Sequence, residues 1–525
     1  MEAPFLAPES SGSSQDWNVA SQETVIQRHP WRVHGSRYFQ LILLCILILN
    51  NAVVWVAFSA ITPATAAVYG VSPGLVNIVA LSFQMLFLPG TIAGYMLKER
   101  WGLRLTLLAG AFMTAVSAAI RFVSLYVPPV SFRNASTDGH DVNNGGCAYA
   151  LLLLGTSLAA LAQPLLLNTP PDLAVHWFAV KERDLVTSLA FMCSPLGSAL
   201  GVTLAPLFVS EAGADTEEDI SGNHRNDARG GLRLFLLAQL GMGVATTLLA
   251  HAGATDRPPT PPSRAAALGS QREEERVDSS DALGSRVLSM PLAWQLVVPD
   301  LRRCLLCNPS FLLLLFCFGI GLGFFNALLT LLGQLLAPCG YPEAEAGALG
   351  GIFLGTGLVG AVMAGLLMDA SHRYGLLLKG GFLGAWAASL FLVFTLRPDN
   401  FLVLALCFGL LGFTMLPLLP VAIENGVEIT YPDVPEFFSS GLLLSAGNLT
   451  GIPLAFLFAW TIDSYEGSCR KLWKPAAVLV VVVTTACALP VLGYRPRAFG
   501  RWEAEKEQRR EGLEGCGHDV ATRDA

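Results

Sequence analysis

Two loops of this chain carry an acidic residue followed closely by an arginine, each at the end of a long apolar stretch. The first pair is Glu99 and Arg100, within residues 94–104, and the second is Asp369 and Arg373, within residues 365–375. A carboxylate and an arginine at helix ends can hold two packed parts of a protein in one conformation and release them when the parts move. A basic loop can also do no more than orient a membrane protein. Because the pattern occurs twice at corresponding places, we interpret these four residues as gate residues.

A third acidic group follows a later apolar stretch. Glu424 and Glu428 are four residues apart, so they lie on one face of a helix. Glu436 follows nearby and can join them at one side of the membrane. A buried carboxylate without a partner is costly, so we expect a basic partner, for which Arg183 and Lys181 are the candidates. Structural gating is the preferred interpretation of the three glutamates, and contact with a substrate is the alternative.

The elements that must position these groups are twelve apolar stretches, each long enough to cross a bilayer. A hydrocarbon core of about 30 Å needs about 20 apolar residues per helix, with every backbone group hydrogen-bonded inside its own segment. The stretches begin near Tyr38, Ser72, Leu103, Cys147, Asp184, Gly231, Phe311, Glu343, Tyr374, Asn400, Phe437 and Pro475. They form two groups of six around one long charged loop, so the chain is expected to be a helical membrane protein.

Composition supports this interpretation. The 525 residues are 53% hydrophobic and 14% charged, with a mean hydropathy of +0.52, whereas soluble proteins are about 25% charged. The net charge of −7 describes loops and tails and gives no sign of a nucleic-acid partner. The expected partners are the lipid bilayer and a small-molecule solute, and we expect the chain to act as a monomer.

The distribution of Lys and Arg predicts the orientation in the membrane, because these residues gather on the cytoplasmic side. They place both termini and the long central loop in the cytoplasm. Residues 1–36 are polar and contain no apolar signal segment, so we expect the first helix to direct insertion. Asn134-Ala135-Ser136 is an N-glycosylation acceptor on the outer side in this orientation, whereas Asn448-Leu449-Thr450 lies inside a helix and out of reach.

The predicted domains follow from these boundaries. Residues 1–36 are a cytoplasmic tail, 37–252 the first six-helix bundle, 253–309 a cytoplasmic linker, 310–495 the second bundle and 496–525 a second cytoplasmic tail. Within the linker, residues 253–285 are rich in Pro, Ser, Ala and charge, which predicts a flexible tether. Residues 287–306 are amphipathic and predict a helix on the inner membrane surface.

No cofactor, metal site or enzymatic centre is expected from the motifs. Cys304 and Cys307 form a single CxxC without a second pair of ligands for zinc. Cys147, Cys339 and Cys469 fall at outer helix ends, where a disulfide can form, but the sequence selects no pair. There is no H-E-x-x-H motif, and no nucleophile, base and orienting group can be assembled from the membrane positions.

The arrangement of six helices, a cytoplasmic tether and six more helices resembles the major facilitator superfamily, whose halves rock about a site at the membrane midplane. Residues 94–104 are similar to that superfamily's G-x-x-x-D-R-x-G-R loop, with Glu99 in place of the aspartate, and residues 365–375 are the counterpart. The sequence therefore predicts an all-α polytopic membrane protein of this fold, with 12 transmembrane helices in two six-helix halves.

Local stretches resemble the feline leukaemia virus subgroup C receptor-related family within that superfamily. Residues 51–55 are similar to its N-A-x-x-W, residues 161–178 to its A-Q…P…W-F, and residues 427–443 to its V-E-L-T-Y-P…P-E-G…S-S-G-L-L. The resemblance covers nearly all of the membrane region and neither the tails nor the tether. It implies transport of choline and ethanolamine, with haem export also attributed to the family.

The resemblance also implies four substrate-binding residues. Trp55 lies near mid-helix, deeper than a headgroup anchor, and matches a tryptophan that faces choline, where a cation–π contact is available. Gln163 matches a glutamine that points at the ligand, although a membrane amide can also join helices. Asn448 replaces a family glutamine, and Asn326 replaces the choline-facing tyrosine. The change at Asn326 favours ethanolamine or another small polar amine over choline.

The residue types near the membrane midplane bear on two questions: whether transport is coupled to an ion and whether the site can bind haem. The helices expected to line a central site carry no carboxylate or histidine there, which favours facilitated diffusion or weak coupling. Arg121 is expected to snorkel outward or to line the entrance. An iron porphyrin needs an axial His, Cys or Tyr, and none of the eight histidines lies in a helix centre.

Three functions remain open at this stage. The first is an alternating-access transporter for choline, ethanolamine or a similar small polar amine, and the second is a haem transporter. The third is a receptor or sensor that keeps the transporter fold without moving a solute. The plasma membrane is the expected location, with a lysosomal or other internal membrane as the alternative.

Overall fold

The protein is described by a computed structural model that covers residues 32–127, 130–131, 143–144, 146–209, 222–271, 297–336, 339–463, 475–496, 499–506 and 510. The predicted glycosylation acceptor Asn134 lies outside these residues, as do the tails 1–31 and 511–525 and the first part of the predicted amphipathic helix.

The first half of the chain contains six membrane crossings built from seven α-helices and a short 3₁₀ turn. Its elements are α2 (Arg37–Val56), η1 (Ser59–Ile61), α3 (Thr62–Tyr69), α4 (Pro73–Ser124), α5 (Gly146–Leu167), α6 (Pro170–Trp177), α7 (Arg183–Phe208) and α8 (Gly222–Gly253). A two-residue hairpin of β1 (Val130–Ser131) and β2 (Asn143–Asn144) lies between α4 and α5. The second half contains η2 (Arg303–Cys307), α11 (Pro309–Leu336), α12 (Glu343–Ser371), α13 (Tyr374–Thr395), α14 (Phe401–Met415), α15 (Leu418–Thr430), α16 (Glu436–Asp463) and α17 (Pro475–Leu492).

Helix α4 shows why eleven long apolar segments make twelve crossings. Its 52 residues would extend about 78 Å as one helix, far more than the hydrocarbon thickness. The backbone leaves the helical conformation at Gly102, whose φ of 81° favours glycine, and the chain reverses there. Eleven segments in the described residues are apolar enough to span a membrane, and α4 supplies two of the twelve crossings. The predicted fold class is confirmed.

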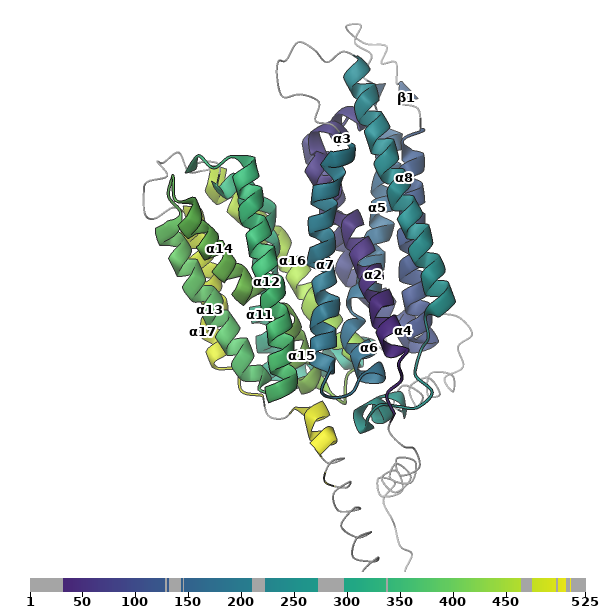
Figure 1. The fold of residues 1–525 in the computed structure, drawn as a ribbon, viewed down its shortest axis with the longest axis vertical. Helices are drawn as coiled ribbons and strands as arrows, with labels where there is room; N and C mark the ends of the chain where they lie inside the picture. Colours follow the sequence, from purple (N-terminus) through teal and green to yellow (C-terminus); the bar gives the residue numbers. More distant parts are fainter. Residues whose placement is uncertain are drawn as a thin grey trace, which may run out of the picture.

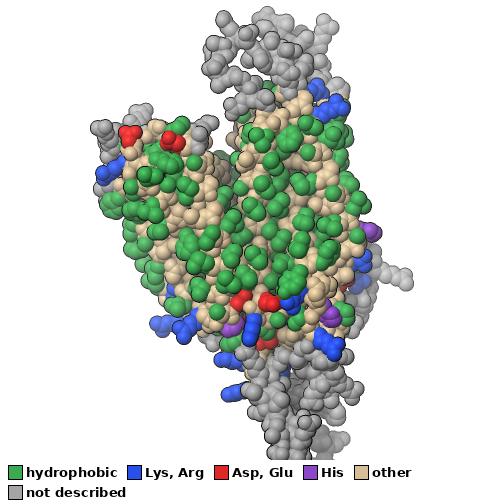
Figure 2. Space-filling view, in the orientation of Figure 1, with side chains coloured by type: hydrophobic (Ala, Val, Ile, Leu, Met, Phe, Trp, Pro, Cys, Tyr) green, Lys and Arg blue, Asp and Glu red, His purple; other side chains and the backbone are tan. Residues whose placement is uncertain are grey.

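The two halves meet at one end and splay apart toward the other (Figure 1). We call the end with α6, α15 and residues 499–506 the closed end, and the end with α3 and the β1–β2 hairpin the open end. Across the halves, α7 packs against α12 and α4 packs against α16. Figure 2 shows a hollow between the halves at the open end, an uncharged band along their length and a concentration of charged side chains at the closed end.

Close helix packing positions the residues that face the space between the halves. A Cβ at Gly197 would lie 2.5 Å from the carbonyl oxygen of Leu49, and one at Gly201 would lie 2.9 Å from that of Val53. Glycines four residues apart therefore bring α7 directly against the backbone of α2. Because Trp55 follows on α2 and Ser198 on α7, this contact fixes the spacing between their two faces.

Two expectations about local structure differ from what is observed. Residues 254–271 of the tether are ordered at the closed end, where His34 Nε2 and Thr260 Oγ1 are 2.9 Å apart and Ala265 and Ala266 are buried. Small side chains can be buried there against other parts of the protein, which a composition-based prediction of flexibility does not consider. Arg121 neither snorkels nor lines an entrance, because it is fully buried with its guanidinium 4.5 Å from the Phe58 ring.

Candidate functional site

A cavity of about 640 Å³ lies between the two halves and brings all four predicted binding residues together. Trp55 comes from α2, Gln163 from α5, Asn326 from α11 and Asn448 from α16. Two residues belong to each half, so a solute between them would contact both bundles. This placement is the geometry that alternating access requires, because rocking of the halves then changes the exposure of the site.

The indole of Trp55 is held in a fixed orientation at this cavity. Its Nε1–H donates to the carbonyl oxygen of Ala80 at 3.3 Å, and its ring centre is 6.1 Å from that of Phe83. Both contacts come from α4, and the side chain is only half-buried. A positioned ring face at an accessible site can attract a cation without a large loss of side-chain entropy.

Three amides complete the predicted set, and they differ in how free they are. The Nδ2–H of Asn448 donates to the carbonyl oxygen of Leu444 at 3.0 Å, so part of its capacity is used inside α16. Within the described residues, the side chains of Gln163 and Asn326 form no hydrogen bond, although both line the cavity. Their donors and acceptors are therefore available to a solute or to water.

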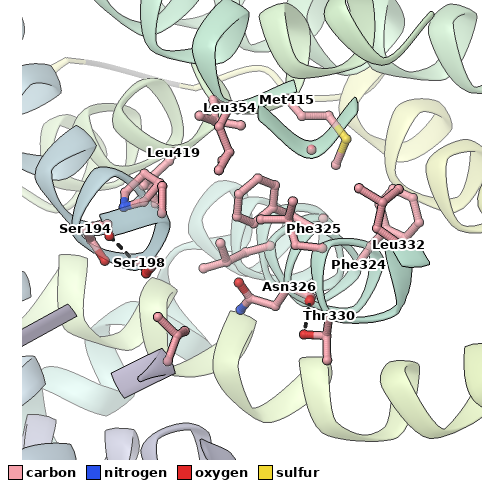
Figure 3. A pocket seen from close by; sticks show the side chains of 18 of the residues that line it. Ser194, Ser198, Phe324, Phe325, Asn326, Thr330, Leu332, Leu354, Met415 and Leu419 are labelled. Carbon is pink, nitrogen blue, oxygen red and sulfur yellow. Dashed lines mark hydrogen bonds between the residues drawn. The ribbon is translucent and has the colours of Figure 1, made fainter. Parts of the chain in front are cut away.

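Several polar cavity residues were missed by the sequence reasoning. They are Ser194 and Ser198, which project from α7, and Thr330, which lies beside the predicted Asn326 on α11 (Figure 3). The hydroxyls of Ser198 and Thr330 donate to backbone carbonyls four residues earlier, at 3.0 and 2.8 Å, and can still accept a hydrogen bond. The available signal was Pro195 inside an apolar helix, because interrupted membrane helices often line transport sites.

Aromatic and aliphatic side chains form the rest of the cavity wall. Phe325 also lines the cavity, and its ring stacks on that of Phe353 with 5.7 Å between the ring centres. Figure 3 shows its ring in the pocket, with Leu354 and Met415 beyond it. Among the described residues that line the cavity there is no Asp, Glu, Lys, Arg or His. The site is uncharged and rich in apolar surface.

The predicted gate residue Asp369 links the halves at the closed end. Its two carboxylate oxygens accept hydrogen bonds from the backbone N–H groups of Asp184 and Leu185, each at 3.0 Å. These groups begin α7, so the carboxylate of one half caps a helix of the other half, where the helix dipole also favours a negative charge. Nearby, the Tyr374 hydroxyl donates to the Asp184 carboxylate at 2.9 Å.

Glu99, Arg100 and Arg373, the other members of the two loop pairs, behave differently from Asp369. The carboxylate of Glu99 lies 3.9 Å from the ammonium group of Lys98, and that ammonium group forms a buried ion pair with Asp172 at 2.8 Å. Arg100 and Arg373 are exposed. The guanidinium of Arg373 has no hydrogen-bond or ion-pair partner in the described part of the chain, so a helix N-terminus, not the loop arginine, receives the Asp369 carboxylate.

Glu424 and Glu428 lie buried on one face of α15, as their spacing predicted, but their partner is neither Arg183 nor Lys181. The guanidinium of Arg501 binds both carboxylates. This expectation was wrong because an arginine beyond the last membrane helix cannot be paired with α15 from sequence spacing. Glu436 lies in the first turn of α16, where its charge complements the helix dipole.

The disulfide expectation is supported at one cysteine. Cys339 is disulfide-bonded, and its partner lies outside the described residues, whereas Cys147 is free. Cys304 lies in an apolar environment, where burial raises the pKa of its thiol to about 12. No group of three or more His, Cys, Asp or Glu is placed to hold a metal ion in the part of the chain that the structure describes.

The chain is similar in sequence to known membrane transporters. The family model for the Major Facilitator Superfamily matches residues 43–427. Solute carrier family 49 member A3 of Xenopus tropicalis is 29% identical over 82% of this chain and 78% of its own length. Choline/ethanolamine transporter FLVCR1 of Mus musculus is 26% identical over 79% of this chain and 68% of its own, and the human FLVCR2 is 26% identical over 86% and 76%.

Solved structures share the fold at low sequence identity. The Escherichia coli fucose:proton symporter FucP matches with a TM-score of 0.62 and 13% identity over 88% of this chain and 99% of its own. A proton:xylose symporter, XylE, matches with a TM-score of 0.63 and 12% identity over 90% and 99%. The sequence resemblance to the feline leukaemia virus subgroup C receptor-related family is confirmed by the relatives.

Proposed function

Because this chain belongs to the major facilitator superfamily and is a multi-pass membrane transporter, we propose that it carries choline, ethanolamine or a similar small polar amine by alternating access. The observation that carries the proposal is the convergence of Trp55, Gln163, Asn326 and Asn448 on one cavity between the halves. Relatives named choline/ethanolamine transporters are similar over most of the chain, which supports the same class of solute.

The chemistry of the cavity fits a small amine. The face of Trp55 attracts the ammonium group, and the free amides of Gln163 and Asn326 bind a hydroxyl or an N–H. Phe325 and the aliphatic wall contact the methyl or methylene groups. Among the described residues that line the cavity there is no carboxylate, so selectivity depends on these contacts and not on a formal charge. The same lining offers no carboxylate or histidine to couple a proton at the site, which supports facilitated diffusion.

Haem is less well supported by the same cavity. Its two propionates are anionic, and the described residues that line the cavity include no Lys or Arg to compensate them. Cys487 lines the cavity and offers a thiol as an axial ligand, but one such ligand does not balance the missing cations. A receptor without transport remains the alternative from another class, and no feature of the described residues favours it.

Location and assembly complete the proposal. We place the closed end in the cytoplasm, since Lys98 before the turn of α4, Arg183 at the start of α7 and Arg501 of residues 499–506 lie there, and the disulfide of Cys339 on the oxidising side supports this orientation. The plasma membrane is the proposed location. The monomer is the proposed functional unit, because the cavity is built entirely within one chain.

The test is uptake of labelled choline and ethanolamine into cells that express the chain, beside Trp55→Ala and Trp55→Phe. A cation–π contact of about 0.5–2 kcal/mol predicts that Trp55→Ala raises KM about twofold to thirtyfold, while Trp55→Phe retains part of the affinity. Trp460→Ala is the matched control, since this tryptophan is 66% exposed on α16 and outside the cavity lining. Saturable uptake that is the same in Trp55→Ala and the parent would exclude the proposed role of Trp55.

A further inference from the structure

We propose that residues 499–506, here called the tail helix, are part of the gate at the closed end and hold the two halves together when the cavity faces the open end. This segment lies beyond residues 43–427, which the family model matches. The inference rests on the proposed transport function, because a gate has meaning only if the halves rock. Arg501 is its central positioning residue and acts through the two glutamates of α15.

The first support is the ion-pair cluster around Arg501. Its Nε donates to Glu428 at 3.0 Å and its Nη2 to Glu424, while the backbone N–H of Trp502 donates to Glu428 at 3.3 Å. Arg501, Glu424 and Glu428 are 2%, 0% and 3% exposed. Burial would lower the pKa of Arg501, but the two carboxylates outweigh it and hold the pKa well above its ordinary value. Without Arg501, two buried carboxylates would face each other unpaired.

The second support is a contact from the same helix to the other half. Glu505 accepts from Arg183 Nη1 at 3.0 Å, and both side chains are about 5% exposed. Arg183 begins α7 of the first half, whereas Glu424 and Glu428 belong to the second. Arg183 also donates to Ser263 Oγ of the ordered tether segment at 2.5 Å. The tail helix therefore connects both halves through buried charges placed four residues apart.

The third support is the close fit of the tail helix against the second half. A Cβ at Gly500 would lie 2.4 Å from the carbonyl oxygen of Tyr431, so the helix approaches this loop directly. The ring of Phe499 lies 5.5 Å from that of Tyr374, and the ring of Trp502 lies 3.9 Å from that of His372. Packing of this kind fixes the helix to the second half and leaves the Arg183–Glu505 pair as its link to the first.

Opening of the closed end then has a defined consequence. The tail helix moves with α15, because Arg501 and the packed rings hold it there, and Glu505 is drawn away from Arg183. Separation of the pair removes a charge-assisted hydrogen bond that only the closed arrangement makes, so the contact stabilises that arrangement. A weaker Arg183–Glu505 contact increases the population that is open at the closed end. The fraction of protein whose cavity faces the open end then falls, and the apparent KM for solute on that side rises in inverse proportion to this fraction.

The test is a charge exchange across this contact, with Arg183→Glu, Glu505→Arg and the double variant. Spin labels at Lys181 and Leu376, both exposed at the closed end, report the distance between halves in purified protein whose accessible cysteines have been replaced. Each single variant is expected to increase the long-distance population several-fold, and the double variant to restore the parent distribution. Glu503→Arg is the matched control, because Glu503 is exposed on the same helix.

Uptake kinetics of the amine give a second readout. Each single variant is expected to raise KM several-fold, and the double variant to return it to the parent value. If Arg183→Glu fails to reach the membrane, Glu505→Gln tests the same contact with a smaller change. Parent-like distances in both Glu505 variants, or a double variant no better than the singles, would overturn the proposal. The distance measurement needs no transported amine, so a chain that moves neither choline nor ethanolamine would refute the proposed function without deciding this one.

Discussion

The central cavity and the closed end use opposite chemistry. Among the described residues, the cavity between the halves is lined without a single formally charged side chain. At the closed end, charged groups lie buried, or half-buried in the case of Asp369, and are ion-paired or hydrogen-bonded: Lys98, Asp172, Arg183, Asp184, Asp369, Glu424, Glu428, Arg501 and Glu505. The comparison indicates that the cavity recognises the solute through its shape, its amides and its aromatic faces. The closed end controls the conformation through charged groups and their hydrogen bonds.

This division has an energetic reason. A buried charge without a partner costs far more than one that is paired, so a layer of such charges favours two distinct states over intermediate ones. A neutral cavity lacks such strong interactions, so a cationic solute can enter and leave without breaking an ion pair. Transport requires this weakness, since a tightly held solute would not be released.

The largest effect is expected from Asp369→Ala. This change removes two charge-assisted hydrogen bonds between the halves and leaves the N-terminus of α7 uncapped. The loss of about 2 kcal/mol or more shifts the equilibrium between closed and open arrangements by about 30-fold. We expect a large decrease in maximal uptake at equal surface expression, measured as the initial rate at saturating solute.

Arg373→Ala is the control for that prediction. Arg373 belongs to the same loop and was predicted from the sequence with equal weight, but its guanidinium is exposed and has no partner in the described residues. Its loss should leave uptake within about twofold of the parent, as for other exposed charges. Equal losses in the two variants would contradict the assignment of the gate to the contact between Asp369 and the helix N-terminus.

Periodicity and length predicted the fold because bilayer thickness imposes them on every crossing. The expected start near Glu343 coincides with the first residue of α12, and that near Pro475 with the first residue of α17. Trp55 and Gln163 were assigned to the binding site from motifs that resemble those of the family, and a mid-helix amide in a membrane usually faces the interior. Both residues line the cavity. Their role in binding remains a prediction.

Long-range pairings were not predictable in the same way. The binding of Arg501 to Glu424 spans 77 residues and involves a tail outside the family resemblance, so no periodicity connects the two. Ser194 was missed because a serine in an apolar helix commonly satisfies itself through the backbone four residues earlier. The packing of α7 on α2 determines which side of α7 faces the cavity, and Gly197 and Gly201 allow that close packing.

An intermediate effect is expected from a charge introduced into the neutral region. Ser194→Asp places a carboxylate at the cavity wall, where attraction to an ammonium group about 5 Å away contributes about 1–3 kcal/mol at an effective dielectric constant of 20–80. We expect KM for ethanolamine to fall at least about fivefold, with slower release of solute. Ser194→Asn supplies the matched neutral control. An unchanged or higher KM in Ser194→Asp alone would argue against a cationic solute.

The smallest effect is expected where this chain departs from its relatives within the cavity. The resemblance places a choline-facing tyrosine at Asn326, so Asn326→Tyr would add a further aromatic face, from the half of the protein opposite Trp55. A further cation–π contact of about 0.5–1 kcal/mol predicts a two- to fivefold fall in KM for choline, with little change for ethanolamine, whose ammonium can donate hydrogen bonds to the original amide. Asn326→Leu separates the aromatic effect from bulk, because it fills similar space without a π-system. If Asn326→Tyr changes KM for choline and for ethanolamine by the same factor, other residues of the cavity determine the selectivity between the two amines. The amide of Asn326 would then not be the reason that this site favours a primary amine.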